Sequence, residues 1–183
     1  FKLLTFSLNG QQTWYLGYTG SGEQTLTTAY AGGNSCGGGV MFNITANKTL
    51  NITGFDVSTT LTAGSPVPLT VYYIPNGTYL GNELNAAAWT THGSTTATSA
   101  GSGNATTEIL STSLVIPAGS TYAIYLNYAS AYTNGNGANQ VVSNPDMTVN
   151  LGIGMCGLFT GANNPRVFNG GIIYGGQACS NIK

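Results

Sequence analysis

The sequence predicts an all-β protein, an antiparallel β-sandwich or jelly-roll-like barrel with an additional strand at the N-terminus. Eleven Tyr, six Phe and a hydrophobic content of 42% supply enough apolar surface for a core. Only four Lys and Arg are present, so good helix formers are scarce, whereas the 27 Gly suit turns. Short strand-like segments recur at close spacing between turn sequences, which is typical of sandwiches and barrels.

The charge content excludes several kinds of partner. Charged residues make up 5% of the chain and the net charge is −1, whereas globular domains contain about 25% charged residues. The four basic residues form no patch that could follow a phosphate backbone, so we expect no nucleic-acid partner. No apolar run approaches the roughly 18 residues of a membrane span. The first residue is not Met and no signal peptide is visible, so we expect a mature chain outside the cell or on its surface.

The first predicted element is the strand in "FKLLTFSLNG" (1–10). Leu4, Phe6 and Leu8 alternate with polar residues, which is the pattern of a half-buried strand. With Phe1 and Leu3 they form a candidate donor strand, because alternate side chains can fill pockets in another sheet.

The remaining elements follow in order along the chain. Predicted strands cover 40–45, 49–57, 68–74, 87–98, 107–116, 121–128, 147–153 and 166–175. Predicted turns lie at 75–77, 100–104, 117–119, 134–137 and 163–165, where Gly, Pro and Asn cluster.

The stretch from about Gly39 to Tyr174 resembles a β-sandwich domain that is common in large secreted bacterial proteins. The matching segments read "GVMFNITANKTLNITGFDV" (39–57), "VYYIPNGTYLGNELNAAAWT" (71–90), "TSAGSGNAT" (98–106), "LVIPAGSTYAIYL" (114–126), "YTNG" (132–135) and "NPRVFNGGIIY" (164–174). The resemblance covers roughly three quarters of the chain. It implies the sandwich fold and a cell-surface setting, but no activity, because that domain usually occurs as an uncharacterised module.

The chain is predicted to consist of three segments. Residues 1–12 form the donor-type strand, 13–38 an extension with short strands that ends in a Gly-rich boundary or hinge at 32–39, and 39–183 the sandwich. The first strand either completes its own sandwich or adds to the sheet of a neighbouring copy, as the donor strands of pilus subunits do. We favour exchange, which predicts a pilin-like structural subunit of an extracellular bacterial filament, with the same chain as its partner.

No catalytic, metal or cofactor site is expected. "GIGMCG" (152–157) matches G-x-G-x-x-G, but no helix and no acid follow it, so we interpret these glycines as a loop. His92 is the single histidine and no G-x-S-x-G element accompanies it, which argues against a secreted hydrolase. The five acids are scattered and we expect most of them to be solvated; Asp146 near Asn144 is interpreted as a turn cap rather than a calcium ligand.

Three cysteines without metal-like spacing predict one disulfide in a secreted chain. If the strands at 40–45 and 166–175 pair at one sheet end, Cys36 and Cys179 lie just beyond that end. We therefore favour Cys36–Cys179, with Cys156–Cys179 as the alternative. The remaining cysteine is then buried or links subunits.

Five N-x-S/T sequons are candidate glycosylation sites, although such triplets arise by chance in chains rich in Asn and Thr. They begin at Asn43, Asn47, Asn51, Asn76 and Asn104. The first three fall on adjacent strands and their turn, so some must point inward. Asn76 and Asn104 fall in turns and are the better candidates for covalent sugars.

Aromatic residues offer an alternative function. Trp14, Tyr15 and Tyr18 form a candidate interface or sugar platform in the extension, whereas Trp89 is expected in the core. A platform of this kind would suit a carbohydrate-binding or adhesive module of a cell-surface protein.

Overall fold

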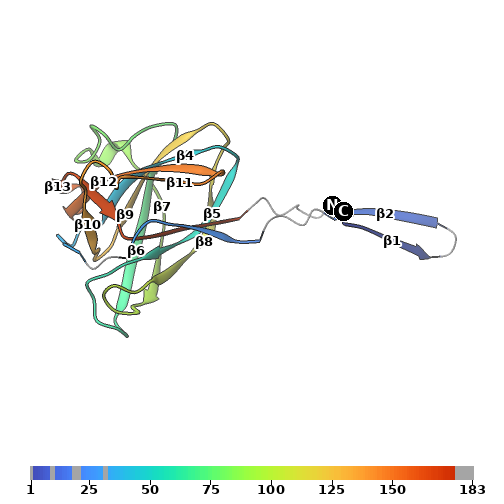
Figure 1. Ribbon diagram of the computed structural model, residues 1–183, viewed down its shortest axis with the longest axis horizontal. Coiled ribbons are helices and arrows are strands. Elements are labelled where there is room, and N and C mark those ends of the chain that lie inside the picture. Colours follow the sequence, from blue (N-terminus) through green and yellow to red (C-terminus); the bar gives the residue numbers. More distant parts are fainter. Residues whose placement is uncertain (1, 9–10, 18–21, 31–32, 176–183) are drawn as a thin grey trace.

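A computed structural model describes residues 2–8, 11–17, 22–30 and 33–175, with side chains from residue 22 onward. The predicted all-β class is confirmed: antiparallel strands form a seven-stranded and a four-stranded sheet that pack face to face, and two further pairs of strands (Figure 1). The described part contains a single helical turn, η1 (Ala86–Ala88), and no helix long and apolar enough to cross a bilayer.

The larger sheet has the order β11-β12-β4-β9-β6-β7, and β13 also pairs with β12. Its strands are β4 (Val40–Ala46), β6 (Pro66–Ile74), β7 (Thr90–Thr98), β9 (Thr121–Asn127), β11 (Val141–Ser143), β12 (Met147–Gly157) and β13 (Thr160–Asn163). Neighbours in the sheet are antiparallel throughout. β7 therefore forms one edge of this sheet, with β11 and β13 at the other.

The smaller sheet has the order β3-β15-β5-β8, with β3 and β8 at its edges. Its strands are β3 (Gln24–Thr27), β5 (Leu50–Val57), β8 (Thr106–Ile116) and β15 (Gly170–Gly175). β3 lies in the segment predicted as an extension, yet Leu26 is 7% exposed and joins the core. A separate pair, β10 (Tyr132–Asn134) and β14 (Arg166–Phe168), completes the sandwich.

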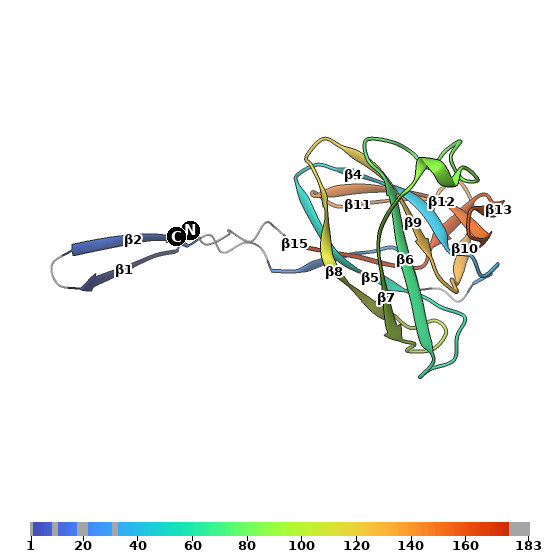
Figure 2. The ribbon, with the colours of Figure 1, turned by 180° about the vertical axis from the view of Figure 1, so that it is seen from behind.

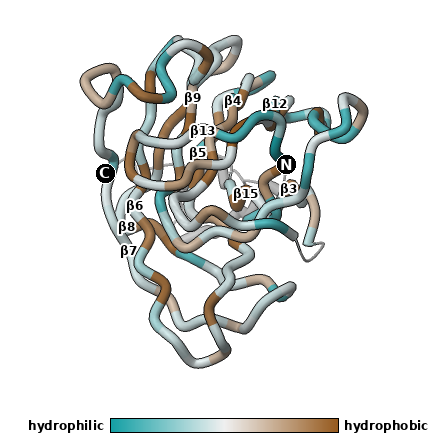
Figure 3. Tube along the Cα trace, turned by 90° about the vertical axis from the view of Figure 1, so that its left-hand side faces the viewer, coloured by the Kyte–Doolittle hydropathy of each residue, from teal (hydrophilic) through white to brown (hydrophobic). Residues whose placement is uncertain are grey.

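The core lies between the two sheets and follows from strand alternation. Figure 3 shows hydrophobic stretches on strands of both sheets, interrupted by paler residues. On β5, Leu50, Ile52 and Val57 are fully buried. The rings of Phe42 and Phe168 stack at 5.2 Å between centroids. Burying such side chains is worth about 1.5–3 kcal/mol each.

A second apolar cluster covers the other face of the larger sheet. Met41 and Tyr125 point to this face, and Trp89 packs against the Tyr125 ring at 5.9 Å. The predicted core position of Trp89 is confirmed, since it is 8% exposed and its indole N–H donates to the Asn82 carbonyl. Because both faces are covered, β4 is buried almost continuously.

The "GIGMCG" segment is part of strand β12, and its interpretation as a loop was wrong. A side chain at Gly152 would clash with the Tyr79 hydroxyl, and one at Gly154 with the Tyr132 ring. These glycines let aromatic side chains approach the backbone of a strand, which is a recognised role of strand glycine.

Contrary to the predicted hinge over 32–39, Gly38 and Gly39 are fixed between β12 and β9. The Gly38 N–H donates to the Met155 carbonyl, and the Met155 N–H donates to the Gly39 carbonyl, both at 2.9 Å. The Tyr125 hydroxyl and the Asn127 amide also donate to the Gly38 carbonyl. A side chain at either glycine would clash with neighbouring backbone, so only glycine fits here.

The disulfide joins Cys36 to Cys156, so the favoured pairing of Cys36 with Cys179 was wrong, as was its alternative. The error came from placing the strand at 40–45 beside the one at 166–175. In the structure β4 pairs with β12, with Val40 opposite Gly154, while β15 lies in the other sheet. Cys36 therefore reaches the end of β12. Cys179 lies outside the described residues.

The N-terminal strand is present as β1 (Lys2–Leu8) and pairs antiparallel with β2 (Gln11–Gly17). Figures 1 and 2, which show opposite sides of the molecule, both place this hairpin apart from the sandwich.

Candidate interaction surface

The terminal hairpin forms a two-stranded sheet of its own. Its register places Leu4 opposite Tyr15, Thr5 opposite Trp14 and Phe6 opposite Thr13. A hairpin of two strands is marginally stable at best in water, and a third strand or a packed face is needed to hold it. Among the predicted interface residues, Phe1 and Tyr18 lie outside the described residues.

The edges of the two sheets lie next to each other on two sides of the sandwich. On one of these sides a network of polar side chains connects the sheets. There the Tyr174 hydroxyl donates to Asp146 at 2.9 Å and accepts from the Asn144 amide at 2.8 Å. Asp146 also forms an ion pair with Lys48 at 2.8 Å. The Lys48 hydrogen bond, aided by the one from Tyr174, holds the pKa of Asp146 below its ordinary value. This network links the smaller sheet to the larger one beside β3 and β12.

The turn-capping role predicted for Asp146 belongs to its neighbour. The Asn144 side-chain oxygen accepts hydrogen bonds from the backbone N–H groups of Asp146 and Met147, at 2.9 and 3.0 Å. Asp146 is instead the partner of Lys48.

β7 and β8 lie together on the other side of the sandwich (Figure 2), and we call this side the β7–β8 seam. No backbone ladder joins these strands within the described residues. Two side-chain hydrogen bonds link them instead. The Ala97 N–H donates to the Glu108 carboxylate at 3.2 Å, and the His92 ring donates to the Thr112 carbonyl at 2.9 Å.

Most of the five acids were expected to be solvated, but Glu108 is fully buried beneath the seam. Burial raises the pKa of its carboxyl, and hydrogen bonds from Ala97 and Thr95 oppose this shift. Its second oxygen, Oε2, is buried without a hydrogen-bond partner, and no cation is paired with it among the described residues. Glu108 thus places a carboxyl group beneath the seam with no ion-pair partner among the described residues and with one oxygen that accepts no hydrogen bond.

The five sequons differ in accessibility. Asn43 is 9% exposed. Its side-chain amide donates to the Thr78 hydroxyl and its side-chain oxygen accepts from the Tyr79 N–H, so both ends of this amide are hydrogen bonded within the fold. Asn51 is half-buried on β5, and Asn47 is exposed and donates to the Pro145 carbonyl.

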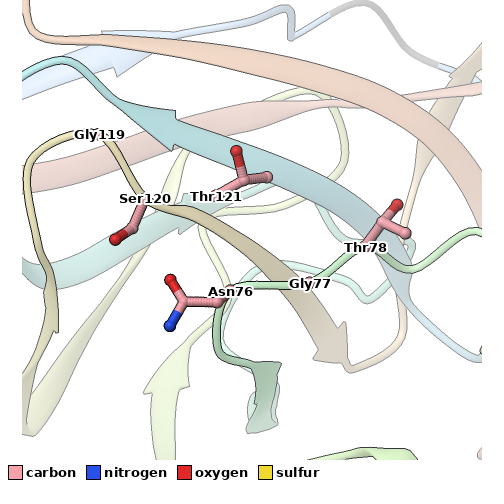
Figure 4. Close-up of a pocket in the computed structure, with 6 residues that line it drawn as sticks. All are labelled: Asn76, Gly77, Thr78, Gly119, Ser120 and Thr121. Carbon is pink, nitrogen blue, oxygen red and sulfur yellow. The ribbon is translucent and has the colours of Figure 1, made fainter.

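Asn76 and Asn104 are exposed in turns, as predicted. Asn76 has φ +50°, in the left-handed region that Asn tolerates better than most residues. Together with Thr78, Ser120 and Thr121 it borders an open groove of about 440 Å³. Figure 4 shows the Asn76 side chain at the rim of this groove.

Among the described side chains, titratable residues do not cluster. No group of three or more His, Cys, Asp or Glu side chains able to hold a metal occurs within residues 22–30 and 33–175. His92 is partly exposed, and its ring packs edge-on against Tyr73 at 6.1 Å. The most distinctive surface features are therefore the terminal hairpin and the sheet edges.

Neither a protein-family model nor any curated protein shows a significant match to this sequence.

Proposed function

We propose that this protein is a structural subunit that assembles into an extracellular filament by donating its N-terminal strand to the next copy. The observation that carries the proposal is the hairpin itself: β1 pairs only with β2 among the described residues, and both views place the pair apart from the sandwich (Figure 1). Two strands alone are marginally stable. A further strand from another copy would supply the missing pairing and cover the apolar side chains.

Strand donation joins two different surfaces of identical subunits. Such a head-to-tail contact grows into a filament unless the rotation between copies closes a ring. Main-chain hydrogen bonds would give affinity, and the alternating Leu4, Phe6 and Leu8 would fill pockets of the acceptor. A chain with 5% charged residues and a net charge of −1 can pack against its own copies with little charge repulsion.

An extracellular location is part of the proposal. The Cys36–Cys156 disulfide supports it, because disulfides persist in oxidising compartments and are rare in the cytosol. The exposed sequons at Asn76 and Asn104 support covalent sugars on the filament surface. The predicted relation to secreted bacterial sandwich domains fits the same setting.

The test replaces apolar residues of β1 in the full chain. We expect Leu4→Asp with Phe6→Asp to abolish filaments in electron micrographs and to leave monomers in sedimentation velocity, because a charged group in an apolar pocket is costly. The matched control, Thr5→Asp with Ser7→Asp, introduces the same charges at the intervening positions of the same strand. We expect it to retain assembly.

Filaments that persist in the Leu4 and Phe6 variant would refute strand donation, as would a wild-type chain that remains monomeric at every concentration. A monomer whose binding to a glycan array is lost on Trp14→Ala would instead favour the adhesive module.

A further inference from the structure

We propose that the strand donated by one copy adds along the free edge of β8 in the next copy, at the β7–β8 seam. This inference rests on the proposed strand donation and identifies the acceptor surface for it. The occupant is the β1–β2 hairpin of a second copy.

Strand length restricts the choice of acceptor edge. Added strands bind through a continuous run of main-chain groups, and β1 has seven residues. The edge strands β3, β11 and β13 have four, three and four residues. β7 has nine residues and β8 has eleven. Among the described strands, only the two edges at the seam can therefore pair with β1 along its whole length.

The side chains favour β8 over β7. β8 carries exposed Ile109 and Val115, at 54% and 44% exposure, whereas neither β7 nor β8 contains Lys or Pro. Lys and Pro usually protect edge strands against unwanted pairing, and both strands at the seam lack this protection. β7 reads TTHGSTTAT and offers Thr and Ser on its exposed positions. β8 is thus both the longest described edge and the more apolar of the two.

β8 is also bulged where it meets β5. Its register with β5 passes from Gly54 opposite Ile109 to Ile52 opposite Leu114. The four residues 110–113 therefore have no paired partner on β5, and β8 bulges there. Leu110, within this bulge, is only partly buried although it packs against the core. An apolar strand added along the outer edge of β8 would cover the part of the Leu110 side chain that is still exposed.

Charge on the two partners is compatible with this contact. Residues 1–17 contain one charged residue, Lys2. β7 and β8 contain one acidic residue, Glu108, which is buried and points inward. Addition along β8 would therefore bring no like charges together. A main-chain ladder along this edge would replace the hydrogen bond that the His92 ring donates to the Thr112 carbonyl.

Hydrogen exchange of the full chain tests the acceptor directly. We expect amides in residues 106–116 to exchange at least about tenfold more slowly in assembled protein than in monomer, because each tenfold change reflects about 1.4 kcal/mol of added protection. Amides of β3 and β11 should change little. Protection that appears on β3 or β11 instead, with β8 unchanged, would overturn the inference and leave strand donation intact.

A matched pair of substitutions gives a second readout. Val115→Lys places a charge on β8, whereas Val141→Lys places the same charge on the edge strand β11, where Val141 is 60% exposed. We expect Val115→Lys to raise the concentration needed for assembly about tenfold or more, and Val141→Lys to leave it unchanged. The reverse result would overturn the inference. Thermal melts check that both variants are folded, and if Val115→Lys is not, hydrogen exchange of the wild type decides. A wild type that never assembles would instead refute the proposed function itself.

Discussion

Replacing the buried Glu108 by Gln is expected to stabilise the protein at neutral pH, although the change removes one of only five acidic side chains. The carboxyl group is fully buried, and Oε2 has no hydrogen-bond partner. A Gln side chain keeps the shape of Glu and an oxygen that can accept the hydrogen bond from the Ala97 N–H. What it removes is the charge.

The sign follows from proton linkage. In the unfolded chain the Glu108 carboxyl ionises near its ordinary pKa of 4.5, while burial raises the pKa in the folded state. Between these two values the folded protein retains a proton that the unfolded chain has lost. The free energy of unfolding therefore falls as pH rises through this window, and the loss persists at pH 7.

The magnitude comes from the same burial. Each unit of separation between the two pKa values costs about 1.4 kcal/mol. The Gln amide is itself polar and places an NH2 group where Oε2 has no partner, so the substitution recovers only the cost of the charge. We therefore expect E108Q to gain about 1 kcal/mol at pH 7. For a domain of this size, each kcal/mol raises Tm by about 2–4 °C.

Urea denaturation at pH 7 and about pH 3.5 measures the difference, which should vanish at the lower pH because Glu108 is then neutral in both states. The control is Glu83→Gln, a half-buried acid outside the sandwich core, expected to change the free energy of unfolding by less than about 0.5 kcal/mol at both pH values. If E108Q were less stable than the wild type at pH 7, or if the difference were equal at both pH values, the buried charge would not be the destabilising group.

Three further predictions concern stability and modification. Replacing Cys36 and Cys156 by Ser opens a covalent loop with a sequence separation of 120. The free energy of unfolding measured in urea should then fall by about 2–5 kcal/mol. A loss below about 1 kcal/mol would contradict this. Phe42→Ala removes a fully buried ring stacked on Phe168. It should lower the free energy of unfolding by about 3–5 kcal/mol in the same assay. A loss as small as that of a surface substitution would contradict a core position for this ring. In glycopeptide mass spectra of the native protein we expect sugar on Asn76 and none on Asn43, because Asn43 is buried and hydrogen bonded; modified Asn43 would be incompatible with the fold.

Strands with a clear alternation could be predicted closely from the sequence. The expected strand at 49–57 is β5 (Leu50–Val57), and the one at 107–116 is β8 (Thr106–Ile116). The expected strand at 166–175 divides into β14 and β15, with a break at Asn169 that local propensity did not reveal. The alternation of Leu4, Phe6 and Leu8 likewise marked β1, because the signal lies within the segment itself.

Features that depend on which strands become neighbours could not be predicted in this way. The disulfide partner of Cys36 follows from the pairing of β4 with β12, and no local signal reports that pairing. Gly152 and Gly154 resemble loop residues until the rings of Tyr79 and Tyr132 are in place.

Burial of Glu108 could have been anticipated. Its position has the same parity as Leu110, Leu114 and Ile116, all of which point toward the interior or its margin.

The disulfide also determines which part of the chain would carry mechanical tension. If the chain were pulled by its two ends, the bond between Cys36 and Cys156 would carry the force past residues 37–155 and prevent their extension, although the β15–β5 ladder would still pull on β5. β4 to β9, with their ladders and most of the core, would remain folded inside a covalent loop. Extension would be limited to the segments outside it, beginning with the short β3–β15 ladder, in which Gln24 pairs with Tyr174. Such a molecule would yield by a short length under load and then resist further extension until the disulfide is reduced.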